Sequence, residues 1–146
     1  MRISLGGDNK KLVAASWLDK RDFEGGYDVY AAVSEDGGKT FGTDELVQDM
    51  FGENTPQWHN AIAVSNKGQI VVTWDDTRDG LPRIWLSERR HGNWSADTAI
   101  NDPEEEIKES HPVICFDSLG RLHIAYVQQG KNLNRIIYIM GETEQN

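Results

Sequence analysis

A six-residue pattern that occurs twice constrains this chain more than any other feature. Residues 17–22 and 74–79 both read W-x-D-x-R-D, and the two copies lie 57 residues apart. A repeat of this length exceeds that of most helical repeat proteins and suits one four-stranded β-propeller blade per period. The pattern therefore constrains the architecture strongly and leaves the activity open.

Weaker matches extend the repeat to a third copy. A step of 52 residues aligns residues 70–74 with 122–126, and the same step aligns His59 with His111. No segment has a helical period. We therefore expect an all-β fold, a β-propeller of four-stranded antiparallel blades with about three blades in the chain. We expect a single domain, residues 1–146, with three blades at 1–52, 53–105 and 106–146. The third blade lacks its outer strand.

The strands are predicted from apolar alternation and from the turns between them. Residues 70–74 have apolar side chains on both faces, which fits a sheet packed between two others. Gly68 and Gly120 stand where tight hairpins require a positive backbone dihedral. The predicted strands are 3–5, 11–18, 27–34, 45–48, 61–65, 69–75, 83–88, 98–101, 112–117, 121–127 and 135–140.

Composition narrows the possible partners and locations. The formal net charge of −9 opposes binding to nucleic acid or anionic membranes, and no basic cluster offsets it. No apolar run approaches membrane-spanning length and no signal peptide is visible. We expect a soluble protein, cytoplasmic as written and secreted if the sequence is a fragment. The acidic run 104–106 is interpreted as a solvated loop, and Cys115 as a small buried residue in an apolar strand.

The most specific motif is an eight-residue segment, 34–41, that reads S-E-D-G-G-K-T-F. Asp and Ser oxygens in such a turn can accept backbone N–H groups, Gly permits the left-handed conformation, and the aromatic ring closes onto the sheet. The segment resembles the Asp-box of the sialidase superfamily, also called the BNR repeat, and residues 87–94 keep only its frame. The resemblance implies a structural turn on the side of a propeller away from the active site. Its structural residues are Ser34, Asp36, Gly38, Thr40 and Phe41.

Because consecutive strands alternate in direction, the remaining polar motifs lie on the rim opposite the Asp-box turn. In the sialidase superfamily this is the face that binds the sugar. Arginine forks bind carboxylates, aspartates accept from hydroxyls, and tryptophan stacks on sugar rings. This combination predicts a glycan site. Glu109 is placed on the same rim. The candidate ligand-binding residues are Asp19, Arg21, Asp22, Trp58, His59, Asp76, Arg78, Asp79 and His111.

An alternative interpretation of the W-x-D-x-R-D motif is structural. An Asp two residues before an Arg, repeated in consecutive blades, can be an ion pair that fixes the strand ends. The two histidines open equivalent strands and can act as hydrogen-bonding groups there. With four His and no ligand-like spacing, we expect no metal site, and no cofactor is predicted.

Catalytic residues are not assigned. The sialidase superfamily uses an arginine triad, a Tyr nucleophile assisted by Glu, and an Asp acid/base. Its aromatic-Arg-Ile-Pro motif is echoed only by Arg2-Ile3, and none of the four tyrosines can be identified as a nucleophile. We therefore expect a non-catalytic propeller that binds glycans or a protein partner. The alternative is a sialidase-like glycoside hydrolase whose site is completed by dimerisation.

The number of repeats predicts a partner. Three blades cannot close a ring, and an open half-ring would expose apolar flanks. Two copies related by a two-fold axis would close a six-bladed ring. We expect a homodimer; the competing explanation is a fragment of a longer enzyme.

Overall fold

The computed structural model describes residues 3–21, 26–49, 55–101 and 106–142, and these residues form β-strands and no helix. None of them therefore builds a helix that could cross a membrane. The strands form three antiparallel sheets, which confirms the all-β prediction.

Consecutive strands pair within each sheet, as an up-and-down meander requires. Sheet A contains, in spatial order, β1 (Ile3–Gly7), β2 (Val13–Asp19), β3 (Asp28–Ser34) and β4 (Glu45–Leu46). Sheet B contains β5 (Trp58–Val64), β6 (Ile70–Asp76), β7 (Arg83–Arg90) and β8 (Asn93–Trp94), with β9 (Thr98–Ala99) also paired to β7. Sheet C contains β10 (Lys108–Phe116), β11 (Arg121–Gly130) and β12 (Leu133–Glu142).

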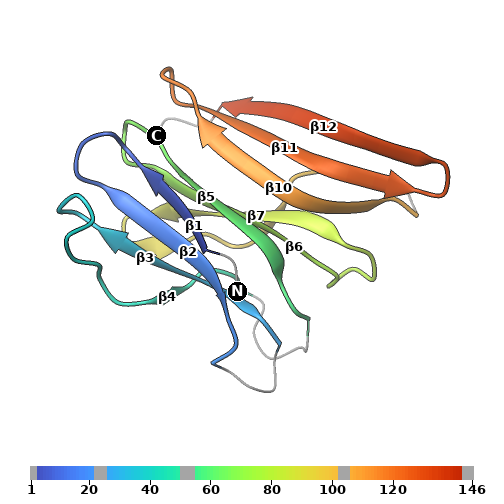
Figure 1. Cartoon of the computed structure of the whole chain (residues 1–146), viewed down its shortest axis with the longest axis horizontal. Coiled ribbons are helices and arrows are strands. Elements are labelled where there is room, and N and C mark those ends of the chain that lie inside the picture. Colours follow the sequence, from blue (N-terminus) through green and yellow to red (C-terminus); the bar gives the residue numbers. More distant parts are fainter. Residues whose placement is uncertain (1–2, 22–25, 50–54, 102–105, 143–146) are drawn as a thin grey trace.

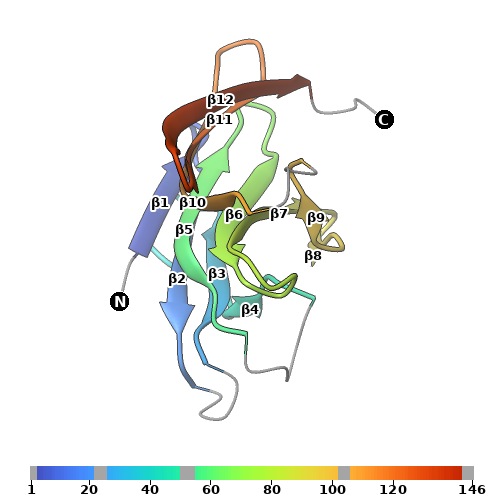
Figure 2. The same cartoon turned by 90° about the vertical axis from the view of Figure 1, so that its right-hand side faces the viewer.

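The three sheets form layers with sheet B in the middle (Figure 1). The first strand of sheet B, β5, packs against β1 and β10, the first strands of the other two sheets. The first strands therefore lie on one side of the molecule, and the short strands β4, β8 and β9 on the other (Figure 2). Because neighbouring strands are antiparallel, β1, β5 and β10 begin at the edge where β2, β6 and β11 end. We call this the start edge, and the opposite edge the turn edge.

Two apolar cores hold the layers together. The core between sheets A and B includes Leu18, Val29 and Trp74, and the core between sheets B and C includes Ile84 and Tyr126. All seven residues of β6 are buried. This confirms that the second repeat has apolar residues on both faces because it packs between two other sheets.

Two of the first strands begin earlier than the sequence predicted. β5 begins at Trp58 rather than Ala61, and β10 begins at Lys108 rather than Pro112. Each has a β-bulge near its start, between Trp58 and Ala61 in β5 and after Ser110 in β10. A bulge adds a residue and breaks the two-residue alternation from which strands are predicted.

The fourth strand predicted in the second repeat is also different. Residues 98–101 were expected to form it, but two short strands, β8 and β9, both pair with β7. β7 turns into β8 through His91 and Gly92, which both have positive φ, as in the two-residue turns that suit strand twist. The polar residues between Trp94 and Thr98 then carry the chain to its second contact with β7.

The hairpins at the turn edge follow one design. Gly68 and Gly120 have φ of 84° and 82°, which confirms their predicted positive dihedral. In one hairpin Ser65 Oγ accepts from the amides two and four residues later, at 3.3 and 3.0 Å. In the next, Asp117 Oδ1 accepts from the equivalent amides, both at 2.9 Å. Side-chain acceptors thus fix the turns that set the strand register.

A charged clamp joins the outer strands of sheets A and B. Arg89 donates from Nε and Nη2 to the two carboxylate oxygens of Glu45, each at 2.7 Å. Trp94 Nε1 donates to the same carboxylate at 2.9 Å. A bidentate pair of this kind fixes both distance and orientation between the two sheets.

Sheets A and C each have one face that no other described sheet covers. Cys115 is exposed on this side of sheet C, so the prediction that it is buried was wrong. The sequence shows an apolar strand but not whether a neighbouring sheet covers it. The large apolar residues exposed on the two terminal sheets are Ile3, Leu5, Val113, Ile136, Tyr138 and Met140.

Candidate functional site

The start edge carries most of the predicted ligand-binding residues. Asp19 ends β2, Asp76 ends β6, and Trp58 begins β5. His111 lies near the beginning of β10. One candidate, Asp22, lies outside the described residues.

The first W-x-D-x-R-D motif forms a compact hydrogen-bonded unit. Asp19 Oδ2 accepts from Trp17 Nε1 at 3.1 Å, and from Arg21 Nε and Nη2 at 3.0 and 2.6 Å. Arg21 also donates to Asp44 at 2.8 Å, and its guanidinium lies 4.1 Å from the Tyr30 ring centre. The hydrogen bond from Arg21 is the main cause that lowers the pKa of Asp19.

The second motif repeats this unit in a buried setting. Asp76 Oδ2 accepts from Trp74 Nε1 at 3.0 Å and from Arg78 Nη2 at 2.6 Å. Arg78 Nη1 donates to Asp97 at 2.7 Å, and its guanidinium lies 4.1 Å from the Trp85 ring centre. Burial alone would lower the pKa of Arg78, but the hydrogen bonds to Asp76 and Asp97 outweigh burial and raise it.

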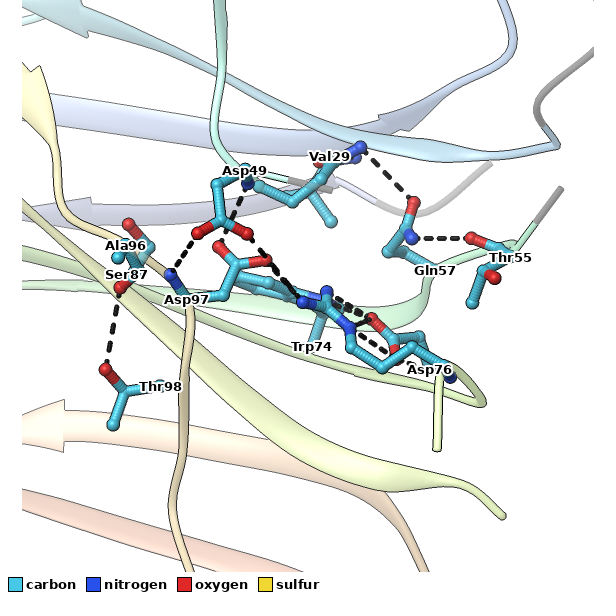
Figure 3. A network of polar contacts seen from close by, with 12 residues as sticks. Val29, Asp49, Thr55, Gln57, Trp74, Asp76, Ser87, Ala96, Asp97 and Thr98 are labelled. Atoms are coloured by element: carbon cyan, nitrogen blue, oxygen red, sulfur yellow. Dashed lines mark hydrogen bonds and ion pairs between the residues drawn. The ribbon is translucent and has the colours of Figure 1, made fainter. Parts of the chain in front are cut away.

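Asp97 also forms two hydrogen bonds with Asp49 (Figure 3). The amide of Asp49 donates to Asp97 Oδ1 at 3.1 Å, and the amide of Asp97 donates to Asp49 Oδ2 at 3.0 Å. Burial raises the pKa of Asp97 to about 6, against the lowering effect of Arg78. Burial would also raise the pKa of Asp49, but its hydrogen bonds with Asp97 and the charge of Arg78 lower it.

The two arginines are therefore occupied by partners within the chain. Each guanidinium hydrogen-bonds to two carboxylates and covers an aromatic ring, and Arg78 Nη1 also lies 3.9 Å from Asp49 Oδ1. The side chain of Arg78 is only 7% exposed. Arg21 is 44% exposed, but its fork faces Asp19. This geometry is that of the structural alternative, in which the repeated motif fixes the strand ends.

The two candidate histidines meet at the start edge. The rings of His59 and His111 stack with centroids 3.7 Å apart and planes inclined by 26°. His59 Nδ1 lies 2.8 Å from Asp75 Oδ1, and the main-chain amide of His111 donates to the same oxygen at 3.1 Å. His111 Nδ1 lies 2.9 Å from Ser110 Oγ. One carboxylate thus fixes a histidine on each of two sheets.

Both histidines occupy an unusual backbone conformation. The φ angles of His59 and His111 are 46° and 59°, in the left-handed region. This conformation is uncommon for residues other than glycine and costs on the order of 1–3 kcal/mol where the surroundings impose it. Burial raises the pKa of Asp75, while the two adjacent histidines act in the opposite direction. A strained backbone beside a buried carboxylate is typical of functional sites.

An exposed aromatic pair adjoins the histidines. The side chain of Trp58, which directly precedes His59, is 41% exposed. Its ring lies 5.7 Å from that of Tyr27, inclined by 54°. The ammonium of Lys20 lies 5.9 Å from the Tyr27 ring centre. This surface combines an apolar ring face with hydrogen-bonding groups, as small-molecule sites do.

Glu109, which the sequence placed on the rim, is fully buried. Its Oε1 accepts from Asn101 Nδ2 at 2.8 Å and from Gln128 Nε2 at 2.7 Å, and Asn101 also donates to the Tyr126 hydroxyl at 2.9 Å. Burial and the Glu109 carboxylate raise the pKa of Tyr126 to about 12. Glu109 therefore belongs to the packing between sheets B and C.

The predicted Asp-box segment forms a turn at the turn edge, after β3. Asp36 Oδ1 accepts from the amides of Lys39 and Thr40, both at 2.9 Å, and its Oδ2 accepts from Thr40 Oγ1 at 2.7 Å. Ser34 Oγ accepts from the amide of Gly38 at 2.9 Å. The bonds from Thr40 lower the pKa of Asp36 to about 2. These local side-chain bonds hold the turn together, and Phe41 is 44% exposed.

Sequence reasoning missed two residues of the start edge, Asp75 and Tyr27. Asp75 stands at the position that Leu18 occupies in the first repeat. A carboxylate at this position of an apolar strand was the signal that could have identified it. Asp79, the last residue of the second motif, is exposed. Within the described ranges, no group of three or more His, Cys, Asp or Glu could hold a metal ion.

Comparison with known proteins identifies the fold. No model of a protein family matches the chain, and no curated protein matches it. A solved Hadza microbial sialidase, Hz136, is similar over 96% of this chain, with a TM-score of 0.72 and 15% identity. A Penicillium chrysogenum α-L-arabinanase and a Fusarium graminearum GH93 α-L-arabinofuranosidase, both solved with arabinobiose, each match 89% of the chain. Their TM-scores are 0.63 and 0.64, with identities of 17% and 16%.

The chain thus has the β-propeller fold of sialidase-like glycoside hydrolases. It spans 34% of the sialidase and 41% of each of the two arabinan-active enzymes. At these identities the similarity establishes the fold and not the activity.

Proposed function

We propose that this chain is a non-catalytic carbohydrate-binding propeller whose ligand site is the start edge around Trp58. The exposed Trp58 ring beside Tyr27 carries the proposal, because an exposed indole supplies the flat apolar surface on which sugar rings stack. His59 and His111 supply polar contacts at the same place. Glycoside-hydrolase propellers with the same fold support a carbohydrate as the ligand class.

Calorimetric titration tests this site. Arabinobiose, sialic acid, galactobiose and digalacturonate are titrated into the wild type and into Trp58→Ala. Binding should fall about two- to ten-fold in Trp58→Ala, since an aromatic stacking contact is worth about 0.5–1.5 kcal/mol. Phe41→Ala is the matched control, because Phe41 is equally exposed but lies at the turn edge. Equal binding by both variants, or no binding by the wild type, would refute the proposal.

A second candidate function is glycoside hydrolysis with a site completed by another copy of the chain. The activities named for the structural neighbours favour it. In the described residues the best-placed acid/base pair is Asp75 with His59, where a buried carboxylate orients an imidazole. Turnover of aryl glycosides or arabinobiose that is lost in His59→Asn would support hydrolysis, and the absence of turnover would favour the binding function.

We further propose that two copies close a six-bladed ring, with three blades from each. The uncovered faces of sheets A and C support this, because Leu5 and Ile136 are 67% and 78% exposed. A second copy would cover these faces and so remove their apolar surface from water. Light scattering should give a dimer, and Ile136→Lys should give a monomer and speed thiol labelling of Cys115. A folded wild-type monomer at micromolar concentration would refute ring closure.

A further inference from the structure

We propose that His59 and His111 bind the carboxylate of an acidic sugar, a uronic acid, whose ring stacks on Trp58. This inference rests on the proposed carbohydrate-binding function and specifies its ligand class. It starts from the stacked imidazoles, the shared carboxylate of Asp75 and the left-handed backbone at both histidines.

The hydrogen bonds determine which atoms face a ligand. Asp75 Oδ1 lies against His59 Nδ1, so a neutral His59 carries its proton on Nδ1 and leaves Nε2 bare. His111 Nδ1 is likewise engaged, by Ser110 Oγ. Each ring therefore offers Nε2 as its remaining polar atom. Nε2 becomes a donor to an anion when the ring takes up a second proton.

Charge balance then points to an anion. Imidazole is the side chain that gains charge near neutral pH. Among the described residues, Asp75 contacts the His59 ring and the main-chain amide of His111, and the two imidazoles contact each other. Asp75 balances one imidazolium, so two imidazolium ions leave one positive charge uncompensated. A single ligand carboxylate supplies the missing negative charge.

The same geometry argues against a metal ion. Zinc ligands direct their nitrogen lone pairs toward one point about 2.0–2.1 Å away. Each lone pair lies in its ring plane, and these two planes are nearly parallel and stacked 3.7 Å apart. The lone pairs of the two rings therefore do not converge at that distance. A carboxylate has two oxygens and can meet two separated donors.

The two histidines lie on different sheets: His59 is in β5 of sheet B, and His111 is in β10 of sheet C. A carboxylate bound by both rings would contact each sheet at its start edge. Trp58 directly precedes His59 in β5, so its exposed ring lies at the same edge of the molecule as the histidine pair. A uronic acid combines a sugar ring with a carboxylate and fits both features.

The test compares two disaccharides that differ only in their carboxylates, α-1,4-linked digalacturonate and α-1,4-linked galactobiose. Both are titrated calorimetrically at pH 5.5 and 7.5, in two buffers of different ionisation enthalpy so that proton uptake is measured. The variants are His59→Asn and His111→Asn, because asparagine tolerates positive φ. The control is His91→Asn, since His91 also has positive φ (51°) but lies in the β7–β8 hairpin at the turn edge.

At pH 5.5 the wild type should prefer digalacturonate by about ten-fold or more, with proton uptake on binding. The preference should fall to less than about two-fold at pH 7.5 and in each start-edge variant, and it should persist in the His91 control. Equal affinity for both sugars, or a preference that survives in His59→Asn and His111→Asn, overturns this inference and leaves the carbohydrate-binding function intact. If neither sugar binds, but a neutral sugar from the wider panel does, only the uronic acid assignment fails. If no sugar binds, both proposals fail.

Discussion

Arg78→Ala and Arg21→Ala should differ sharply in their effect on stability, although the two arginines occupy the same position of one repeated motif. The side chains of Arg78, Asp76 and Asp97 are 7%, 0% and 2% exposed. Removing Arg78 leaves two buried carboxylates without their counter-charge, and breaking a buried pair costs about 3–5 kcal/mol. In a single copy of the chain the exposed Arg21 pair lies in water, where ion pairs contribute little.

The lower part of this range is expected for Arg78→Ala at pH 7. Asp97 already has a pKa of about 6, and removal of the guanidinium that lowers it raises it further, so taking up a proton at pH 7 costs at most about 1.4 kcal/mol. Asp76 retains its bond from Trp74 but loses its bidentate partner. We therefore expect a loss of about 3 kcal/mol, and a smaller loss at pH 5, where Asp97 is already protonated.

Urea unfolding followed by tryptophan fluorescence and circular dichroism measures both variants. With a slope of about 2 kcal/mol/M, the Arg78 loss corresponds to a midpoint shift of roughly 1.5 M. The Arg21 variant should unfold close to the wild-type midpoint. If Arg78→Ala is unfolded in water, Arg78→Lys keeps the charge and should give an intermediate shift. Equal shifts for Arg21→Ala and Arg78→Ala would refute the reasoning.

Two further predictions concern packing and pH. Gly6→Ala should destabilise the protein by about 1–3 kcal/mol in urea unfolding, because its Cβ would lie 3.2 Å from the amide nitrogen of Val64 in β5. Gly7→Ala is the control, because its Cβ meets only ordinary contacts of 3.4 Å or more; equal losses would contradict the close approach of β1 and β5. The raised pKa of Asp97, about 6, means that its stabilising contribution is complete below its unfolded value of 3.8 and is lost as the pH rises through 6. Asp97→Asn should therefore gain about 3 kcal/mol relative to the wild type between pH 4 and 7, and a difference that does not change with pH would refute the assignment.

Much of the fold could be predicted from the sequence because the chain repeats its own solutions. The period gave the all-β class, and the glycines of the hairpins marked turns whose positive φ the structure confirms. The turn around Asp36 was predictable because each of its hydrogen bonds is local in sequence. The β-bulge of β5 could not be predicted, since it interrupts alternation without a Gly or Pro signal. The bulge of β10 did carry such a signal, because Pro112 lies inside it.

The candidate site was predicted only in part because its geometry depends on contacts between sheets. The alignment of His59 with His111 was visible in the sequence, but their stacking requires β5 and β10 to be neighbours. The burial of Glu109 and the exposure of Cys115 depend on which faces are covered. The ion-pair geometry of Arg78 likewise depends on Asp97, which lies 19 residues away.

Crystallography of the chain with a saturating oligosaccharide tests the proposed function most directly. The account predicts density for a sugar ring over Trp58 at the start edge, close to His59 and His111. Density confined to the turn edge, around Phe41 or Arg89, would contradict it. So would the absence of sugar density at concentrations that saturate binding in solution.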